Sequence, residues 1–146
     1  MEQFFGGILI ITGIGMIGVW IYLFLRALST KNWASTTGKI INGEVINSGT
    51  SAGSNSWSPT IKYLYSINDN QFEGDRIKII VSSYSSTKKA QKELDKYPVN
   101  SSVKVYYKPD NPADSVIIPG VAMGIFGILA GGLVLTIVGI LLALYK

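Results

Sequence analysis

The chain has 146 residues, a formal net charge of +4, and neither cysteine nor histidine. Without cysteine there is no disulfide framework and no thiolate metal ligand, and without histidine the commonest zinc ligand and general base are missing. The positive charges are dispersed rather than clustered in the basic stripe expected of a nucleic-acid-binding protein. The composition therefore excludes most familiar catalytic sites, and we expect no cofactor, no metal ion and no nucleic-acid partner.

The chain opens with an apolar run that carries no charged residue between Gln3 and Leu25. About 20 apolar residues in a helix cross the roughly 30 Å hydrocarbon core of a bilayer, and this run is longer than that. A signal peptide would require a positively charged start and a small-residue cleavage site, whereas Glu2 follows the first methionine. We therefore expect an uncleaved transmembrane helix over residues 1–28.

Aromatic and basic residues near the ends of the apolar runs are typical of anchors at a membrane–water interface. We expect this role for five residues: Trp20, Tyr22, Arg26, Trp33 and Tyr145. Further positive charge follows the first run at Lys31 and Lys39, whereas Glu2 precedes it. The positive-inside rule therefore favours an orientation with the middle of the chain in the cytoplasm.

Residues 29–115 have the composition of one small soluble domain. Within them, residues 60–67 alternate between apolar and polar side chains, which is the pattern of a half-buried strand. The sequence Asn68-Asp69-Asn70 tolerates positive φ, and a second β-rich stretch follows over residues 72–81, so a hairpin is expected. An earlier strand is predicted over residues 38–46, with Gly43 as a bulge or bend.

The rest of this domain contains three further segments. Residues 47–59 are rich in serine, glycine and asparagine and predict a mobile loop. Residues 86–97 predict a short helix with Ala90, Leu94 and Tyr97 buried, and residues 102–107 predict another strand. Together these elements predict a small antiparallel sheet, closing towards a barrel, that carries one helix.

A second charge-free apolar run extends from Ser115 to Tyr145 and predicts a transmembrane helix over residues 116–146, beginning near Pro119. Glycines lie on one face of each predicted helix, and small residues allow close helix packing. These candidate packing residues are Gly120, Gly124, Gly127 and Gly131 in the second helix, with Gly7, Gly15 and Gly18 in the first. We expect an antiparallel pair of helices; homodimerisation or packing on another membrane protein is the alternative.

Two serine motifs are candidates for nucleophilic chemistry. Gly49-Thr50-Ser51-Ala52-Gly53 matches a nucleophile elbow, but no helix is predicted after it and the chain has no histidine base. Two overlapping segments, Ser85 to Lys88 and Ser86 to Lys89, match the Ser-x-x-Lys spacing of serine–lysine hydrolases, whose other motifs are absent. Helix capping beside a solvated lysine face is the favoured interpretation.

Acidic residues offer a weaker candidate for a cation site. Asp69, Glu73 and Asp75 could supply carboxylate oxygens, but their spacing fits no calcium loop, and neighbouring basic residues favour cross-strand ion pairs instead. Asp110 and Asp114 are interpreted as turn formers beside Pro109 and Pro112. The predicted short helix carries Lys88, Lys89 and Lys92, which would face either solvent or anionic lipid headgroups.

Several of these segments resemble a family of bacterial membrane proteins, domain-of-unknown-function family 3592. The resemblance spans nearly the whole chain, with Asn100 at a position where the family usually has glycine. It implies two membrane helices around a central β-domain and no known activity. The segments that carry it are Trp33-x-x-Thr36-x-Gly38-x-Ile40, Tyr63-x-Tyr65-x-Ile67, Phe72-Glu73-Gly74-Asp75-Arg76-Ile77, Tyr97-Pro98-Val99 and Val103-Lys104-Val105-Tyr106-Tyr107-Lys108-Pro109-Asp110-Asn111-Pro112.

The sequence as a whole predicts an α+β membrane protein in which two transmembrane helices flank a small antiparallel β-sheet or barrel-like domain with one short helix. The favoured function is that of a non-enzymatic scaffold whose β-domain binds a membrane or soluble protein, with the lipid bilayer and a second copy as further partners. The alternatives are an immunity protein that neutralises a toxin and, more remotely, a serine–lysine hydrolase. Exposed sheet edges and the glycine faces are the expected contact surfaces.

Overall fold

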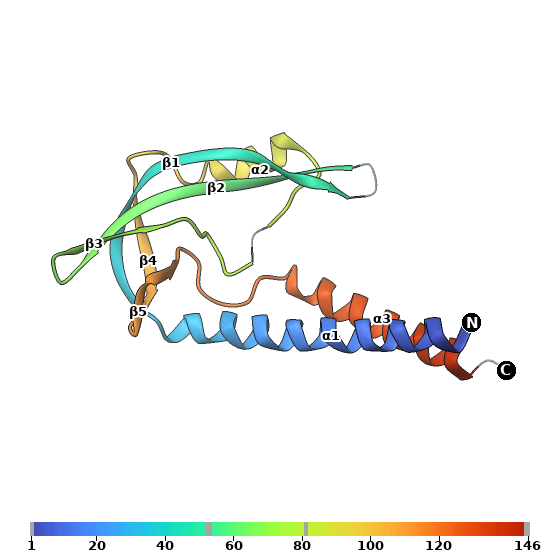
Figure 1. Ribbon diagram of the computed structural model, residues 1–146. Coiled ribbons are helices and arrows are strands. Elements are labelled where there is room, and N and C mark those ends of the chain that lie inside the picture. The colour runs from blue at the N-terminus through green and yellow to red at the C-terminus, as the bar shows by residue number, and fades with distance from the viewer. Residues whose placement is uncertain (1, 52–53, 81, 145–146) are drawn as a thin grey trace. The chain divides into compact units, whose positions relative to one another are not determined.

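The computed structural model describes residues 2–51, 54–80 and 82–144 (Figure 1). The chain divides into two compact units. One unit contains the terminal helices α1 (Glu2–Ser29) and α3 (Ile125–Leu144), and the other runs from Leu28 to Gly120. The second unit is close to the expected domain over residues 29–115 but continues five residues further along the chain.

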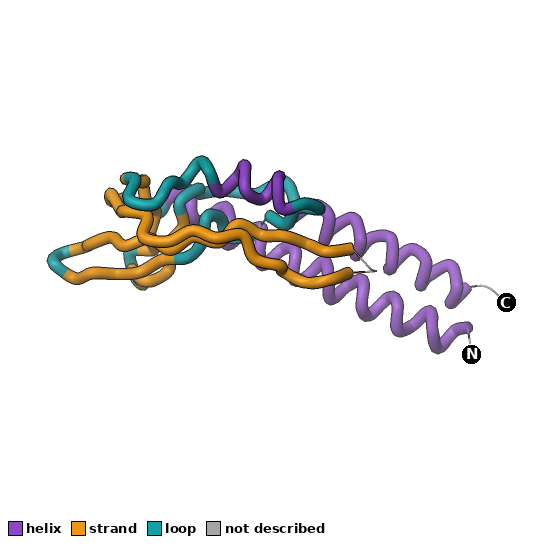
Figure 2. The backbone as a smooth tube through the Cα atoms, turned by 90° about the horizontal axis from the view of Figure 1, so that it is seen from above, coloured by secondary structure: helices purple, strands orange, loops and turns teal. Residues whose placement is uncertain are grey.

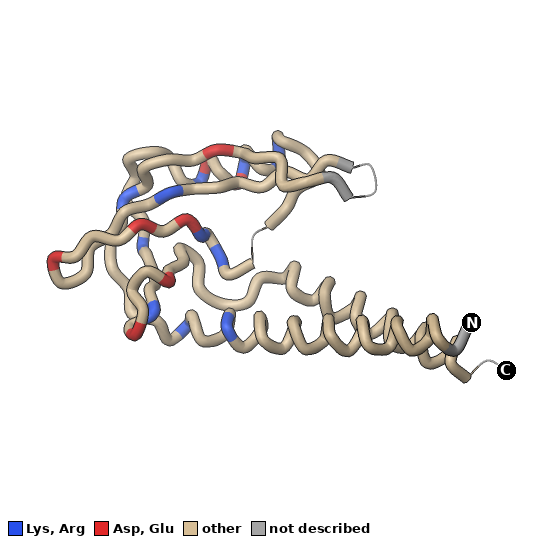
Figure 3. The backbone as a smooth tube through the Cα atoms, in the orientation of Figure 1, with Lys and Arg blue, Asp and Glu red and all other residues tan. Residues whose placement is uncertain are grey.

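Both helices of the first unit are long and apolar enough to cross a membrane, as Phe4–Asn32 and Ile125–Leu144. Their middle turns carry no charged residue (Figure 3). The second helix begins later than predicted, because Pro119 and Gly120 precede it. Gly120 has φ +98°, a left-handed conformation that ends the extended chain before the helix starts.

The second unit is an open, antiparallel five-stranded sheet with one α-helix and a short 3₁₀ segment. The sheet order is β3-β2-β1-β4-β5. The elements are η1 (Thr30–Asn32), β1 (Ala34–Ser51), β2 (Ser54–Ile67), β3 (Asn70–Gly74), α2 (Thr87–Leu94), β4 (Ser102–Lys108) and β5 (Asn111–Val116). The predicted α+β class is confirmed.

Turn and cap residues act as their side chains predict. Asn68 and Asp69, at φ 48° and 64°, form the two-residue turn between β2 and β3, which is the conformation that a tight hairpin requires. Asn100 likewise lies at φ 70° before β4. The Ser86 hydroxyl accepts a hydrogen bond from the Lys89 backbone N–H and caps α2.

The segment expected to be a mobile loop, residues 47–59, is strand in the residues described. β1 and β2 continue through it as a long two-stranded ribbon (Figure 2). The prediction was wrong because main-chain pairing, rather than apolar alternation, defines this part of the ribbon. The bulge expected at Gly43 lies beside Ile41, where the register shifts. Gly43 instead lets α2 approach, since a Cβ there would lie 3.0 Å from the Leu94 side chain.

Two further strand predictions need correction. The stretch predicted over residues 72–81 belongs to β3 only as far as Gly74, after which the chain leaves the sheet. β5 was not predicted, because Asn111 and Pro112 belong to a segment interpreted as a turn. Only Pro109 and Asp110 form that turn, and the chain then pairs with β4 from Asn111 onwards.

The core lies on one face of the sheet, where alternate side chains of each strand point inward. α2 packs against β1 and β2 and contributes to it. The buried cluster consists of Ile40, Ile61, Tyr63, Tyr65, Leu94, Tyr97, Val105 and Ile117. The opposite face of the sheet, called the outer face below, carries the remaining side chains of these strands.

Glycines bring α1 and α3 together, but at a different spacing from the one predicted. A Cβ at Gly13 would lie 2.7 Å from the carbonyl oxygen of Gly132, and one at Gly6 would lie 2.8 Å from that of Gly139. These two pairs are seven residues apart in each helix and run antiparallel. Gly131 makes a looser approach, with the Met16 Cε 3.2 Å from its Cβ position.

The other glycines expected at helix contacts lie elsewhere. Gly120 precedes α3, so it is not on the helix face, and Gly124 also lies before the first residue of α3. A Cβ at Gly7, Gly15, Gly18, Gly124 or Gly127 would meet nothing within 4 Å. These five positions therefore make no close contact between the two helices of one chain.

We predict that Gly13→Leu destabilises the helix pair and that Gly127→Leu does not. A side chain at Gly13 must displace the backbone of α3, which costs about 1–3 kcal/mol for an overpacked site, whereas the position at Gly127 is open. Thermal unfolding of the two full-length variants in the same mild detergent measures the difference. Equal melting temperatures would contradict this helix contact.

Candidate functional site

The two edge strands of the sheet, β3 and β5, are joined through the chain segments that follow them. The Ile117 N–H donates to the Arg76 carbonyl at 3.2 Å, and the Ile118 N–H donates to the Ile77 carbonyl at 2.7 Å. These bonds draw the open sheet towards the barrel-like closure expected from the sequence. The strands themselves remain an open sheet.

Side chains from β2 complete this seam. The Tyr63 hydroxyl donates to the Arg76 carbonyl at 3.2 Å and lies 3.1 Å from the Ser115 hydroxyl. Because a phenol has one proton, Ser115 is the donor in the second bond. Tyr65 donates to the Pro112 carbonyl, and the Arg76 guanidinium pairs with Asp114. Asp114 is therefore an ion-pair partner within β5, rather than the turn former that was predicted.

Burial keeps these tyrosines protonated to a higher pH than an exposed phenol. It raises the pKa of Tyr63 to about 12, and it raises the pKa values of Tyr65 and Tyr97 as well. Each phenol therefore keeps its proton at physiological pH. Tyr63 and Tyr65 are neutral hydrogen-bond donors, and their geometry supports a structural role.

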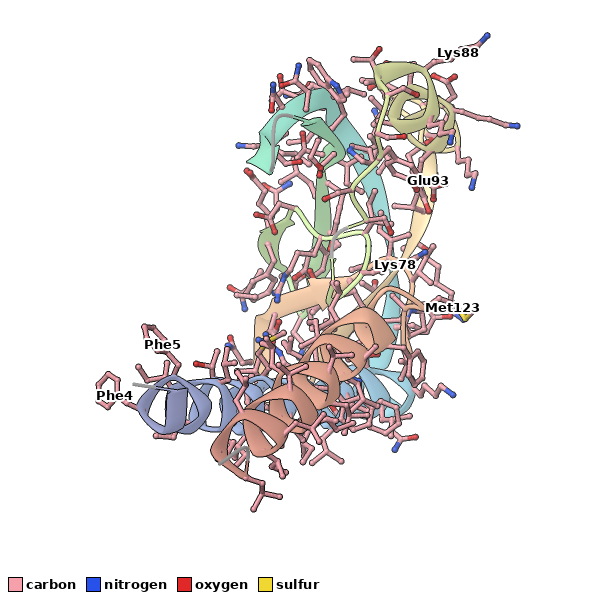
Figure 4. The ribbon with its side chains drawn as sticks, turned by 90° about the vertical axis from the view of Figure 1, so that its right-hand side faces the viewer. Phe4, Phe5, Lys78, Lys88, Glu93 and Met123 are labelled. Carbon is pink, nitrogen blue, oxygen red and sulfur yellow. The ribbon has the colours of Figure 1, made fainter. Side chains whose placement is uncertain are left out.

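The candidate nucleophiles lie in ordinary structural settings. Ser86 is the N-cap of α2, and Lys88 extends away from that helix (Figure 4). In the other motif, Gly49 to Ser51 form the last residues of β1, and Ala52 and Gly53 lie outside the described residues. In the Ser-x-x-Lys motif, the structure therefore shows the helix cap that the sequence predicted.

The acidic residues considered as a cation site each have a different structural role and do not form one cluster. Glu73 pairs across the strands with Lys62 at 3.2 Å, as the sequence predicted, and Asp75 lies 3.9 Å from Arg76. Asp69 forms the hairpin turn. Within the described ranges, no group of three or more acidic residues could hold a metal ion.

The predicted interface anchors occupy varied positions. Trp20 stacks on Phe24 with ring centroids 4.9 Å apart and also contacts Phe126, within the helical unit. Tyr22 is exposed on α1, and Arg26 lies in its last turn. Trp33 is the C-cap of η1, and Tyr145 lies outside the described residues. The apolar end of α1 presents Phe4 and Phe5 outward (Figure 4).

The free edges of the long ribbon are protected against pairing with another strand. On β1, the side chain of Asn42 accepts a hydrogen bond from the Gly43 N–H at 2.8 Å, and that of Asn47 accepts one from the Gly49 N–H at 2.9 Å. The register of β1 with β2 also shifts beside Ile41 and again before Gly49. Bulges and occupied N–H groups make an edge a poor template for an added strand. The edges are therefore weaker contact surfaces than the sequence suggested.

The edge of β2 is protected in a different way. Trp57 and Tyr84 exchange two backbone hydrogen bonds, at 2.9 and 2.8 Å, beyond the end of β3. Pro59, two residues further along β2, has no N–H to offer. Beside it lies a small cavity of about 40 Å³, whose lining includes Ile77, Lys78 and Glu93.

The outer face of the sheet carries mostly polar and exposed side chains. Its side chains come from alternate positions of four strands, in contrast to the apolar inner face. They are Ser35, Thr37, Lys39 and Ile41 of β1, Lys62, Leu64 and Ser66 of β2, Gln71 and Glu73 of β3, and Ser102, Lys104, Tyr106 and Lys108 of β4. Sequence analysis did not single out this surface, although the period-two alternation of the strands was the signal for it.

The fold thus defines a small α+β domain enclosed in sequence by two helices that could span a membrane. A model of the DUF3592 family, a domain of unknown function, matches residues 36–122. The match covers more than half of the chain, and the chain belongs to this family. Comparison with curated proteins finds no match.

We predict that Tyr63→Phe lowers the free energy of unfolding at neutral pH by about 1–3 kcal/mol, because Ser115 loses a buried hydrogen-bond partner. Tyr106→Phe on the outer face is the matched control and should leave this free energy unchanged. Denaturant unfolding of the full-length variants in detergent measures both. A neutral-pH stability that does not change in Tyr63→Phe would contradict the role assigned to this hydroxyl.

The same residue makes stability depend on alkaline pH. Since the folded pKa of about 12 exceeds the ordinary value of 10.0, the folded chain keeps a proton that the unfolded chain releases between these values. The free energy of unfolding therefore falls as the pH rises through this range. In Tyr63→Phe we expect a shallower fall, because the contribution of Tyr63 is removed while the raised pKa values of Tyr65, Tyr97 and Lys96 remain. An unchanged slope between pH 10 and 12 would contradict this assignment.

Proposed function

We propose that the chain is a two-pass membrane protein whose β-rich domain binds another protein and serves as a scaffold. The observation that supports this best is the outer face of the sheet. Four strands there display exposed polar side chains, while the inner face holds the core. A sheet whose edge segments are bonded to each other holds its surface side chains at fixed spacing, and such a framework is suited to recognition.

We propose that the protein is not an enzyme. In support of this, the Ser86 hydroxyl is used as a helix cap, and Tyr63 and Tyr65 remain protonated within the core. Changing Ser85, Ser86, Lys88 and Lys89 together to alanine tests the serine–lysine alternative. We expect the cellular phenotype to persist; its loss in a folded, normally expressed variant would support the hydrolase.

The protein partner is sought by purifying the full-length chain from its native host in mild detergent and identifying co-purifying proteins by mass spectrometry. We expect a stoichiometric protein. If that protein is a toxin, the scaffold is an immunity protein; survival of toxin expression without the chain would argue against this. Recovery of the chain alone, or only as a homo-oligomer, would contradict the protein-binding proposal.

We also propose that the domain lies in the cytoplasm and that the helices lie in the inner membrane of a bacterium. Arg26, Lys31 and Lys39 follow α1, and such basic flanks are retained on the cytoplasmic side. The chain has no cysteine, so a single introduced thiol reports its location without background.

We predict that Val99→Cys, at a position 52% exposed in the domain, is protected from a membrane-impermeant maleimide in intact cells and labelled after lysis. A cysteine at Lys92, also exposed and on α2, should behave identically. The cysteine-free parent chain is the control for labelling of other proteins. Labelling of both positions in intact cells would place the domain on the opposite side and contradict the proposed sidedness.

A further inference from the structure

Two lysines and two hydroxyl groups form a square on the outer face. Thr37 of β1 lies opposite Lys104 of β4, and Lys39 lies opposite Ser102. The two lysines are therefore diagonal neighbours on adjacent strands, with Cα atoms roughly 7–8 Å apart. All four residues are exposed. We call this group the lysine square.

The charges of the lysine square are not neutralised within the described part of the chain. The ion pairs of the domain join Lys62 to Glu73, Lys96 to Glu93 and Arg76 to its two aspartates, whereas Lys39 and Lys104 take part in none of them. The Lys104 ammonium lies 5.2 Å from the centre of the Tyr106 ring. Both ammonium groups are therefore available to an anion from outside the domain, and a carboxylate that accepts hydrogen bonds from them would supply the ion-pair partner that the fold does not.

Shallow hollows lie on both sides of the square. One, of about 370 Å³, is lined by residues that include Ser35, Thr37 and Lys104. The other, of about 360 Å³, includes Lys39 and the apolar residues Ile41 and Leu64. Hydroxyl donors, ammonium groups and apolar side chains therefore occur together on this face.

We propose that the lysine square docks an acidic segment of the protein partner, with Asp or Glu carboxylates held between Lys39 and Lys104. This inference rests on the proposed function and names the surface and the partner's chemistry. Ammonium groups and hydroxyls donate hydrogen bonds, and charge-assisted bonds to carboxylates are the stronger kind. The protected edges of the ribbon favour docking on the sheet face over strand addition.

The experiment places a photo-crosslinking amino acid at Thr37 of the full-length chain in its native host, with Lys88 on the far side of α2 as the control position. Crosslinked peptides are identified by mass spectrometry. We expect a protein crosslinked from Thr37 and not from Lys88, through a segment rich in Asp or Glu. The double substitution Lys39→Glu with Lys104→Glu should lower this product by about tenfold or more, as expected for lost charge complementarity.

The matched control carries the same change of net charge on α2, as Lys88→Glu with Lys92→Glu, and should retain the product. Lys39→Gln with Lys104→Gln serves as a second variant if charge reversal impairs folding, and it should also lose the product. A protein crosslinked only from Lys88, or a segment without acidic residues, would overturn the inference and leave the protein-binding proposal standing. Crosslinks only to lipid, or to no molecule, would contradict both.

Discussion

The hydroxyl of Tyr63 is the group on which the closure of the domain depends. An open five-stranded sheet has two distant edges. Tyr63 reaches from β2 to the segment after β3, through the Arg76 carbonyl, and to β5 itself, through the Ser115 hydroxyl. Gly74 accommodates this, because a Cβ there would collide with the tyrosine ring. The position of the Tyr63 ring therefore requires glycine at position 74, and its hydroxyl requires Ser115 as a hydrogen-bond partner.

The same closure brings the two ends of the domain together. Thr30, fully buried, accepts a hydrogen bond of 2.7 Å from the N–H of Gly120 through its hydroxyl. The chain thus enters and leaves the domain at one place. In the helical unit, glycines allow the two helices to approach closely. Gly6 contacts the backbone of Gly139, and Gly13 contacts that of Gly132. Both units rely on short side chains at the points where segments distant in sequence meet.

The sequence was informative wherever a local rule decides the conformation. The alternation along β2, the Asn68 and Asp69 turn and the Ser86 cap were all predictable for that reason. β5 and the glycine contacts at seven-residue spacing were not predictable. Asp114 forms an ion pair with Arg76, and Gly13 packs against α3, and contacts between residues distant in sequence leave no local pattern. The proposed docking surface could not be predicted from the sequence for a related reason: Lys39 and Lys104 are 65 positions apart, and only the register of β1 with β4 makes them neighbours.

The contrast between the two faces of the sheet is the strongest physical argument for recognition. On the inner side, the polar groups of Tyr63, Ser115 and Arg76 have partners within the fold. On the outer side, Lys39 and Lys104 have no ion-pair partner among the described residues. An acidic partner would supply the carboxylates that these two ammonium groups lack within the fold. That chemistry is the reason why the proposed docking uses the outer face rather than the protected strand edges.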